Sequence, residues 1–149
     1  CDSDIGFVSS LETVMFQADS KLKKINEFAF IDSAIRSFVA PKSLETIGPR
    51  SFETCYNLSD FEFEEGSQLK TIESLAFTAT PIISFTIPDT VESIGSEAFA
   101  FWGSLTDEDG DYIEQEINVP YPDEESATEA YGEGWNDDIY PHCTINYIG

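Results

Sequence analysis

The side chain best suited to acid–base chemistry in this 149-residue chain is its single histidine, His142. A Ser-His or Cys-His nucleophile would have to be assembled around it, because a nucleophilic hydroxyl or thiol needs an adjacent base. Cys143 is its neighbour, but successive side chains of an extended chain point to opposite sides. No nucleophile elbow occurs elsewhere. We therefore expect no catalytic residues and no enzyme activity.

The three cysteines, Cys1, Cys55 and Cys143, are an odd number and lie far apart in the sequence. They form neither a complete disulfide framework nor a CxxC metal or redox motif, and they lack the ligand spacing of a zinc site. No cofactor is expected. Cys1 fits both the acylated first residue of a mature lipoprotein and a fragment boundary. We favour the boundary, because the repeat described below is already under way at Ile5 and Phe7.

Carboxylates cluster in one acidic stretch, residues 107–111 (DEDGD), and hard cations prefer such oxygen ligands. If Gly110 took the glycine position of an EF-hand loop, however, Leu105 would fall at the first ligand position, so that motif fails. The dipeptide Asp-Gly at 109–110 is typical of a hairpin turn. A protruding hairpin is the favoured interpretation. Weak calcium binding is the alternative, with the candidate ligands Asp107, Asp109 and Asp111.

Acidic residues dominate the charged side chains, with 29 Asp and Glu against seven Lys and Arg and a formal net charge of −22. The resulting field repels phosphate backbones and anionic lipid headgroups. No apolar run approaches the ~20 residues of a transmembrane helix. We therefore expect no nucleic-acid partner and no direct membrane insertion. The same field would attract a basic patch on a protein partner, although an acidic exterior often serves solubility alone.

A repeat of 23 to 24 residues runs through the chain. Large aliphatic residues recur at this step, namely Leu11, Ile35, Leu58, Ile82 and Leu105. Each of the first four opens a strand-like stretch of alternating character. The second half of each unit has the pattern Leu-x-x-Ile-x4-Phe, with one Val for Leu, and begins at Leu22, Leu44, Leu69 and Val91. Such a fixed period predicts a solenoid.

A single coil of this length cannot bury its own Leu, Ile and Phe side chains, but stacked copies can. Gly48 and Gly95 are expected to supply the backbone conformations that tight bends demand. The aromatic residues Phe101, Trp102 and Trp135 are expected to be buried in the core or in a cap. A small residue precedes each repeated Phe and leaves room for the ring to turn inward: Ala29, Ser51, Ala76 and Ala98.

Alternate residues of the strand-like stretches should face solvent and align on neighbouring coils. Carboxylate pairs such as Glu62 and Glu64 thus share a solvent face, which argues against an acid–base site. Exposed apolar residues at Met15, Val39 and Ile83 favour a binding surface over a merely solvated one. The predicted binding residues are Thr13, Met15, Gln17, Ser37, Val39, Asp60, Glu62, Glu64, Ser84 and Thr86.

Residues 82–99 (IISFTIPDTVESIGSEAF) carry the fullest copy of the repeat, L-x-x-I-x-I-P-x-x-L-x-x-I-G-x-x-A-F. This pattern resembles the BspA-like leucine-rich repeat, also called leucine-rich repeat type 5, and the resemblance covers roughly residues 5–105. It implies a leucine-rich repeat solenoid, mainly β with short turns, of about four to five coils of about 22–25 residues.

Members of that family are typically surface or secreted proteins of mucosal bacteria and parasitic protists, and several are implicated in adhesion. The resemblance therefore implies a non-catalytic protein–protein interaction module, expected to be the C-terminal part of a cell-surface or secreted adhesin-like protein. Its partner would be a host or microbial surface protein with a basic patch. The alternative is a structural spacer or capping segment of a longer array with no ligand of its own.

The C-terminal third departs from the repeat. A strand is expected at residues 117–120 (INVP), which match residues 85–88 (FTIP). Pro122 at the first helical position, with carboxylates behind it, predicts a short helix to about Tyr131 that glycines then stop. A cap is expected because the last coil must cover its apolar cross-section. One domain, 1–149, is predicted, divided into repeats at about 5–105, an acidic insertion at 106–116, and a fifth strand, helix and cap at 117–149.

Overall fold

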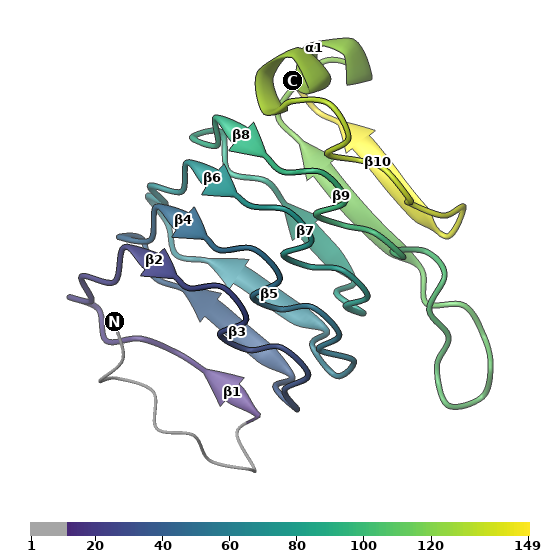
Figure 1. Ribbon diagram of the computed structural model, residues 1–149, viewed down its shortest axis with the longest axis horizontal. Helices are drawn as coiled ribbons and strands as arrows, with labels where there is room; N and C mark the ends of the chain where they lie inside the picture. The colour runs from purple at the N-terminus through teal and green to yellow at the C-terminus, as the bar shows by residue number, and fades with distance from the viewer. Residues whose placement is uncertain (1–11) are drawn as a thin grey trace.

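The computed structural model describes residues 12–149, which form a stack of coils built from parallel strands and one short helix (Figure 1). Each coil contributes a front strand and most contribute a back strand. The front strands are β1 (Thr13–Val14), β3 (Ser37–Ala40), β5 (Asp60–Phe63), β7 (Ser84–Thr86), β9 (Gln115–Val119) and β10 (Cys143–Tyr147). The back strands are β2 (Lys24–Ile25), β4 (Thr46–Ile47), β6 (Thr71–Ile72) and β8 (Ser93–Ile94).

The front strands form two parallel sheets, β1-β3-β5 and β7-β9-β10, and the back strands form one, β2-β4-β6-β8. The Ile83 N–H donates to the Ser59 carbonyl oxygen at 3.2 Å and links the two front sheets into one face. The predicted solenoid is therefore confirmed. Six front strands within residues 12–149 correspond to about six coils, which corrects the predicted four to five.

Two columns of phenylalanine fill the core between the front and back strands. In the first, the rings of Phe30, Phe52, Phe77 and Phe99 stack nearly parallel at centroid distances of 5.2, 5.3 and 5.9 Å. In the second, Phe38, Phe61 and Phe85 follow one another on the front strands. The columns meet edge to face, as between Phe38 and Phe52 at 5.0 Å. Each such pair contributes roughly 0.5–1.5 kcal/mol beyond area burial, so each coil is stabilised by the rings of its neighbours.

The third side of each coil is a tight turn between the back strand and the next front strand. Backbone bonds run between the turns of successive coils, for example from the Phe52 N–H to the Ala76 carbonyl oxygen at 2.9 Å. Two non-glycine residues in each of the first four turns have positive φ, which costs roughly 1–2 kcal/mol per residue. These residues are Phe28, Asp32, Arg50, Thr54, Leu75, Ala79, Glu97 and Phe101.

The role expected for Gly48 and Gly95 is wrong, because neither residue has positive φ. A β-carbon at position 48 would instead lie 2.5 Å from the carbonyl oxygen of Ile25 in the preceding coil. Gly95 meets the backbone of Ser74 in the same way. These glycines therefore permit close approach of two coils. Three of the four small residues before the Phe are confirmed as buried packing positions, namely Ser51, Ala76 and Ala98, whereas Ala29 is half-buried.

The chain after the insertion forms a modified coil and not only a cover. Strand β9 begins at Gln115, so its first two residues fall inside the stretch predicted as an insertion. The helix α1 (Glu124–Tyr131) ends before the C-cap Gly132, as predicted, but its N-cap is Asp123, whose carboxylate accepts from the Ser126 N–H. Pro122 therefore precedes the cap and is not the first helical residue.

The segment after the helix continues the turn side of the solenoid. The Glu97 N–H donates to the Gly134 carbonyl oxygen and the Phe101 N–H to that of Asp138, both at 2.9 Å. Strand β10 then pairs with β9 over five residues. Trp102 and Trp135 are fully buried as predicted, whereas Phe101 is 45% exposed, which corrects its assignment to the core.

The acidic stretch at 107–111 forms a hairpin turn, as predicted. Thr106 and Tyr112 make an antiparallel bridge, and Gly110 has a φ of 87°. One carboxylate oxygen of Asp107 accepts from the backbone N–H groups of Asp109 and Asp111 at 2.9 and 3.0 Å. This carboxylate oxygen is therefore occupied by hydrogen bonds within the turn.

Some sequence predictions concern residues outside the described part of the chain. Cys1, Ile5, Phe7 and the first repeat position, Leu11, all precede residue 12. Within residues 12–149, no helix is long and apolar enough to cross a bilayer.

Candidate functional site

The register of the front strands aligns the predicted binding residues into a stripe on the outer face. Thr13 pairs with Ser37, which pairs with Asp60, and Val39 pairs with Glu62. Ser84 and Thr86 take the corresponding places on β7. We call these seven positions, with Met15 and the β9 and β10 residues named below, the front stripe. It follows directly from parallel pairing with a side-chain period of two.

Two of the predicted residues lie in the turns that follow the front strands. The Gln17 carbonyl oxygen accepts from the Ser20 N–H at 2.9 Å, which closes a turn. Glu64 is half-buried, and its Oε2 accepts from the Lys42 N–H at 2.9 Å. Both residues serve turn structure at the margin of the stripe.

Four further residues extend the stripe onto the last two front strands, and the sequence prediction missed them. Glu116 and Thr144 share a rung with Ser84, and Asn118 and Asn146 share one with Thr86. The sequence contained the signal for two of them. Matching residues 117–120 to 85–88 makes Glu116 and Asn118 equivalent to Ser84 and Thr86.

Hydrogen bonds hold the side chains at this C-terminal end of the stripe. Ser84 Oγ donates to Glu116 Oε1 at 2.7 Å. Asn118 Nδ2 donates to Thr86 Oγ1 at 3.2 Å, and Asn146 Nδ2 donates to Asn118 Oδ1 at 3.0 Å. This ladder fixes the rotamers before any partner arrives, which lowers the entropy cost of binding.

The middle of the stripe differs from this ladder. The exposed side chains of Asp60 and Glu62 have neither a hydrogen bond nor an ion pair with any residue of the described chain. Two of the three apolar side chains predicted to be exposed are open to solvent, with Met15 70% and Ile83 55% exposed, whereas Val39 is half-buried. Uncompensated carboxylates beside exposed apolar atoms are the features that a protein partner could cover.

His142 lies at the surface in a small cluster. Its Nδ1 is 2.7 Å from Oε1 of Glu114, and its ring stacks on Tyr112 at a centroid distance of 4.2 Å. The neighbouring Cys143 is buried, and burial raises the pKa of its thiol to about 12. A thiol of that pKa carries almost no thiolate at neutral pH and is a poor nucleophile.

The other buried cysteine is equally shielded. Cys55 Sγ donates to the Phe30 carbonyl oxygen at 3.0 Å, and burial raises its pKa. Within residues 12–149, no group of three or more His, Cys, Asp or Glu side chains is arranged to hold a metal ion.

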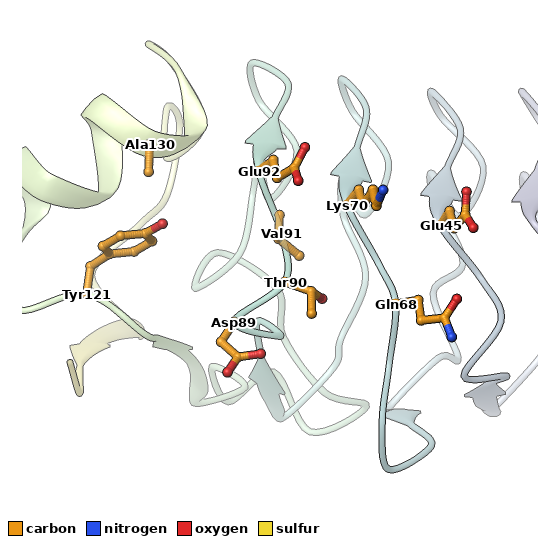
Figure 2. Close-up of a pocket in the computed structure, with 9 residues that line it drawn as sticks. All are labelled: Glu45, Gln68, Lys70, Asp89, Thr90, Val91, Glu92, Tyr121 and Ala130. Carbon is orange, nitrogen blue, oxygen red and sulfur yellow. The ribbon is translucent and has the colours of Figure 1, made fainter.

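An open hollow of about 770 Å³ lies between the back of the solenoid and the C-terminal coil (Figure 2). Tyr121 and Ala130 line it from the C-terminal side, and Val91 from the fourth coil. Charges of alternating sign occupy successive coils before each back strand, in the order Lys23, Glu45, Lys70 and Glu92.

The first two of those charges form an ion pair. Lys23 Nζ lies 2.7 Å from Glu45 Oε1, and this hydrogen bond lowers the pKa of Glu45. Lys70, one coil further, lowers it as well. Lysines on both neighbouring coils therefore compensate the Glu45 carboxylate at this hollow.

Comparison with known proteins shows which repeat family the sequence matches. A family model described as the BspA type leucine rich repeat region matches residues 6–106 in six copies. The pneumococcal vaccine antigen PcpA shares 32% sequence identity, with a TM-score of 0.58, over 59% of this chain and 22% of that one. The leucine rich repeat protein TpLRR of T. pallidum shares 18% identity, with a TM-score of 0.50, over 74% of this chain and 59% of that one.

The chain thus spans about a fifth of the length of the pneumococcal protein and somewhat over half of the treponemal one. The second likeness concerns the fold alone. No protein of curated function matches the sequence.

Proposed function

From its membership of the BspA-type leucine-rich repeat family, to which this chain belongs, we propose that the protein is a non-catalytic protein-binding module. Its binding surface is the front stripe. The observation that carries the proposal is the in-register alignment of outward side chains over β3 and β5, where Asp60 and Glu62 have no hydrogen-bond or ion-pair partner among residues 12–149. Rigid parallel strands hold such side chains at fixed spacing, which suits recognition of another folded surface.

The charge of the stripe favours a partner with a basic patch. Its charged members, Asp60, Glu62 and Glu116, are all carboxylates. Opposite charges across an interface raise the association rate and exclude acidic competitors. Met15 and Ile83 would supply apolar area at the margin of the same contact.

The partner that fits the family is a host or microbial surface protein, and the protein itself would act at a cell surface or after secretion. Support comes from the likeness to PcpA, which is described as a vaccine antigen. Two observations bear on catalysis. The family consists of repeat proteins. The neighbours of His142 are a stacked tyrosine and an exposed glutamate. This arrangement supports binding over catalysis.

The proposal is tested by capturing partners from the native surroundings on the immobilised chain. The stripe variant Asp60→Lys/Glu62→Lys is compared with Glu73→Lys/Glu92→Lys, which makes the same charge change near the back strands. We expect a protein that the unmodified chain and the back variant both retain and the stripe variant loses. Retention of the same proteins by all three would contradict the proposal and favour a structural spacer.

A further inference from the structure

A group of half-exposed aromatic rings lies where the insertion, β9 and the turn before β10 meet. Phe101, Tyr112 and Tyr140 are 45, 55 and 41% exposed, and the side chain of His142 is 38% exposed. We call these four residues the aromatic corner. Large aromatic side chains normally bury most of their area, so several open rings in one place mark an interaction surface.

Two stacked pairs make up the corner. The rings of Phe101 and Tyr140 are nearly parallel, with an interplanar angle of 15° and centroids 6.1 Å apart. Those of Tyr112 and His142 lie 4.2 Å apart at 10°. Tyr140 and His142 belong to one tight turn, closed by a bond from the Cys143 N–H to the Tyr140 carbonyl oxygen at 3.0 Å.

The backbone fixes this turn against the solenoid. The Tyr140 N–H donates to the Trp102 carbonyl oxygen at 2.8 Å, and the Gln115 N–H to that of His142 at 2.9 Å. Gly103 has a φ of 78°, and a β-carbon there would clash with the backbone of Tyr140 and Cys143. The rings are thus presented by rigid backbone on both sides.

Apart from His142 itself, the charged residues of the segments that carry these rings, 97–116 and 133–142, are all Asp or Glu. Glu114 reaches the His142 ring with a side chain that is 76% exposed, and Asp138 accepts the Phe101 backbone N–H through its carbonyl oxygen. The acidic hairpin at 107–111 leads directly into Tyr112. Every Lys and Arg of the chain lies at or before Lys70, so none belongs to the segments that carry the aromatic corner.

We infer that the aromatic corner docks an Arg- or Lys-bearing segment of a protein partner. Guanidinium and ammonium groups bind the faces of aromatic rings, and arginine can pair with carboxylates at the same time. Charge complementarity selects this occupant, because an acidic or neutral apolar segment would gain nothing from the surrounding carboxylates. This surface is separate from the middle of the front stripe and goes beyond the function proposed above.

A peptide with the sequence Gly-Arg-Gly-Arg-Gly, blocked at both ends, is the probe. It is titrated into the full chain at about 150 mM salt, which screens diffuse attraction by the net charge, while backbone amide NMR shifts are followed. We expect the largest shifts at Phe101, Gly103, Tyr112 and Tyr140. A peptide with citrulline in place of arginine should cause none.

Variants then separate the rings from the charge. Phe101→Leu/Tyr112→Leu keeps apolar bulk but removes two ring faces, and should weaken peptide binding roughly tenfold. Tyr56→Leu removes another exposed ring, and Asp60→Asn/Glu62→Gln removes stripe charge. Both should stay within about twofold of the unmodified chain.

Two outcomes would overturn the inference: shifts spread evenly over the acidic surface, or a loss of affinity in the stripe variant as large as in the corner variant. The shift map on the unmodified chain decides the matter even if the corner variant does not fold. Neither result bears on whether the front stripe binds its own partner.

Discussion

Gln115 Nε2 donates a hydrogen bond to the carbonyl oxygen of Thr80 at 2.9 Å, across the point where the insertion leaves the repeat. The same nitrogen donates to Ile82 at 2.8 Å, and Gln115 Oε1 accepts from the Gly103 N–H at 2.8 Å. Gln115 is 3% exposed. One buried amide therefore satisfies three backbone groups that the interrupted coil leaves without strand partners.

Replacing this amide should destabilise the fold strongly. In Gln115→Leu, three buried backbone groups lose their partners, each at a cost of roughly 1–3 kcal/mol. We expect the free energy of unfolding to fall by about 3–5 kcal/mol in urea denaturation followed by tryptophan fluorescence. The exposed Gln68→Leu should change it by less than about 0.5 kcal/mol. Equal effects in the two variants would show that Gln115 does not hold the interrupted coil.

The glycines at positions 48 and 66 should respond differently to alanine. A β-carbon at Gly48 would lie 2.5 Å from the Ile25 carbonyl oxygen, so adjacent coils must separate. Gly66 has a φ of 80° but nothing within 4 Å of such a β-carbon. We expect Gly66→Ala to cost only the left-handed strain of about 1–2 kcal/mol and Gly48→Ala to cost more. The order of the two thermal midpoints checks this, and a reversed order would contradict it.

The phenylalanine columns should carry much of the stability. Phe52 is fully buried and contacts Phe30, Phe38, Phe61 and Phe77. Phe52→Ala is expected to lower the free energy of unfolding by about 3–5 kcal/mol through lost burial and a cavity. Tyr56→Ala, at a 62% exposed site four residues on, should change it by less than about 0.5 kcal/mol. Denaturation curves of the two variants make the comparison.

Alkaline pH should destabilise the protein through its buried thiol. The folded state raises the pKa of Cys143 from 9.0 to about 12, so near pH 10 the unfolded chain has released a proton that the folded chain still holds. Stability from this group is complete below about pH 9 and is lost as the pH rises toward about 12. We expect a loss of about 1 kcal/mol between about pH 8 and pH 10.

Tyr131 acts in the same direction, because burial raises its pKa as well. The variant Cys143→Ala isolates this thiol, since it should retain the contributions of Tyr131 and of Cys55, whose pKa burial also raises, and lose only that of Cys143. Urea denaturation at both pH values measures the difference. An identical pH dependence in the variant and the unmodified chain would exclude Cys143 as the source.

The repeat and its core were predictable because burial imposes a strict period on the chain. Equivalent residues such as Ile47 and Ile72 pair in register, so one rule, that each coil buries its neighbour, determines both the strands and the outward stripe. The cap was predictable in outline for the same reason, since the last apolar cross-section needs cover.

Other features could not be predicted, because they depend on local backbone geometry that the repeat pattern does not encode. The left-handed residues include Arg50, Leu75 and Glu97, which no glycine pattern would identify. Phe101 occupies a turn position held by Asp32 and Thr54 in earlier coils, where the side chain points outward. Gln115 is buried because its side-chain amide forms hydrogen bonds inside the fold. A polar residue at the edge of an insertion does not reveal this burial in the sequence.

The central claim is that the front stripe is the surface that contacts a protein partner. A photo-crosslinking phenylalanine analogue at position 62 is compared with one at position 71, because Glu62 and Thr71 belong to the same coil but lie on the front and back strands. We predict a covalent product with the captured partner from position 62 and none from position 71. A product from position 71 alone, with the complex intact in both variants, would contradict the claim.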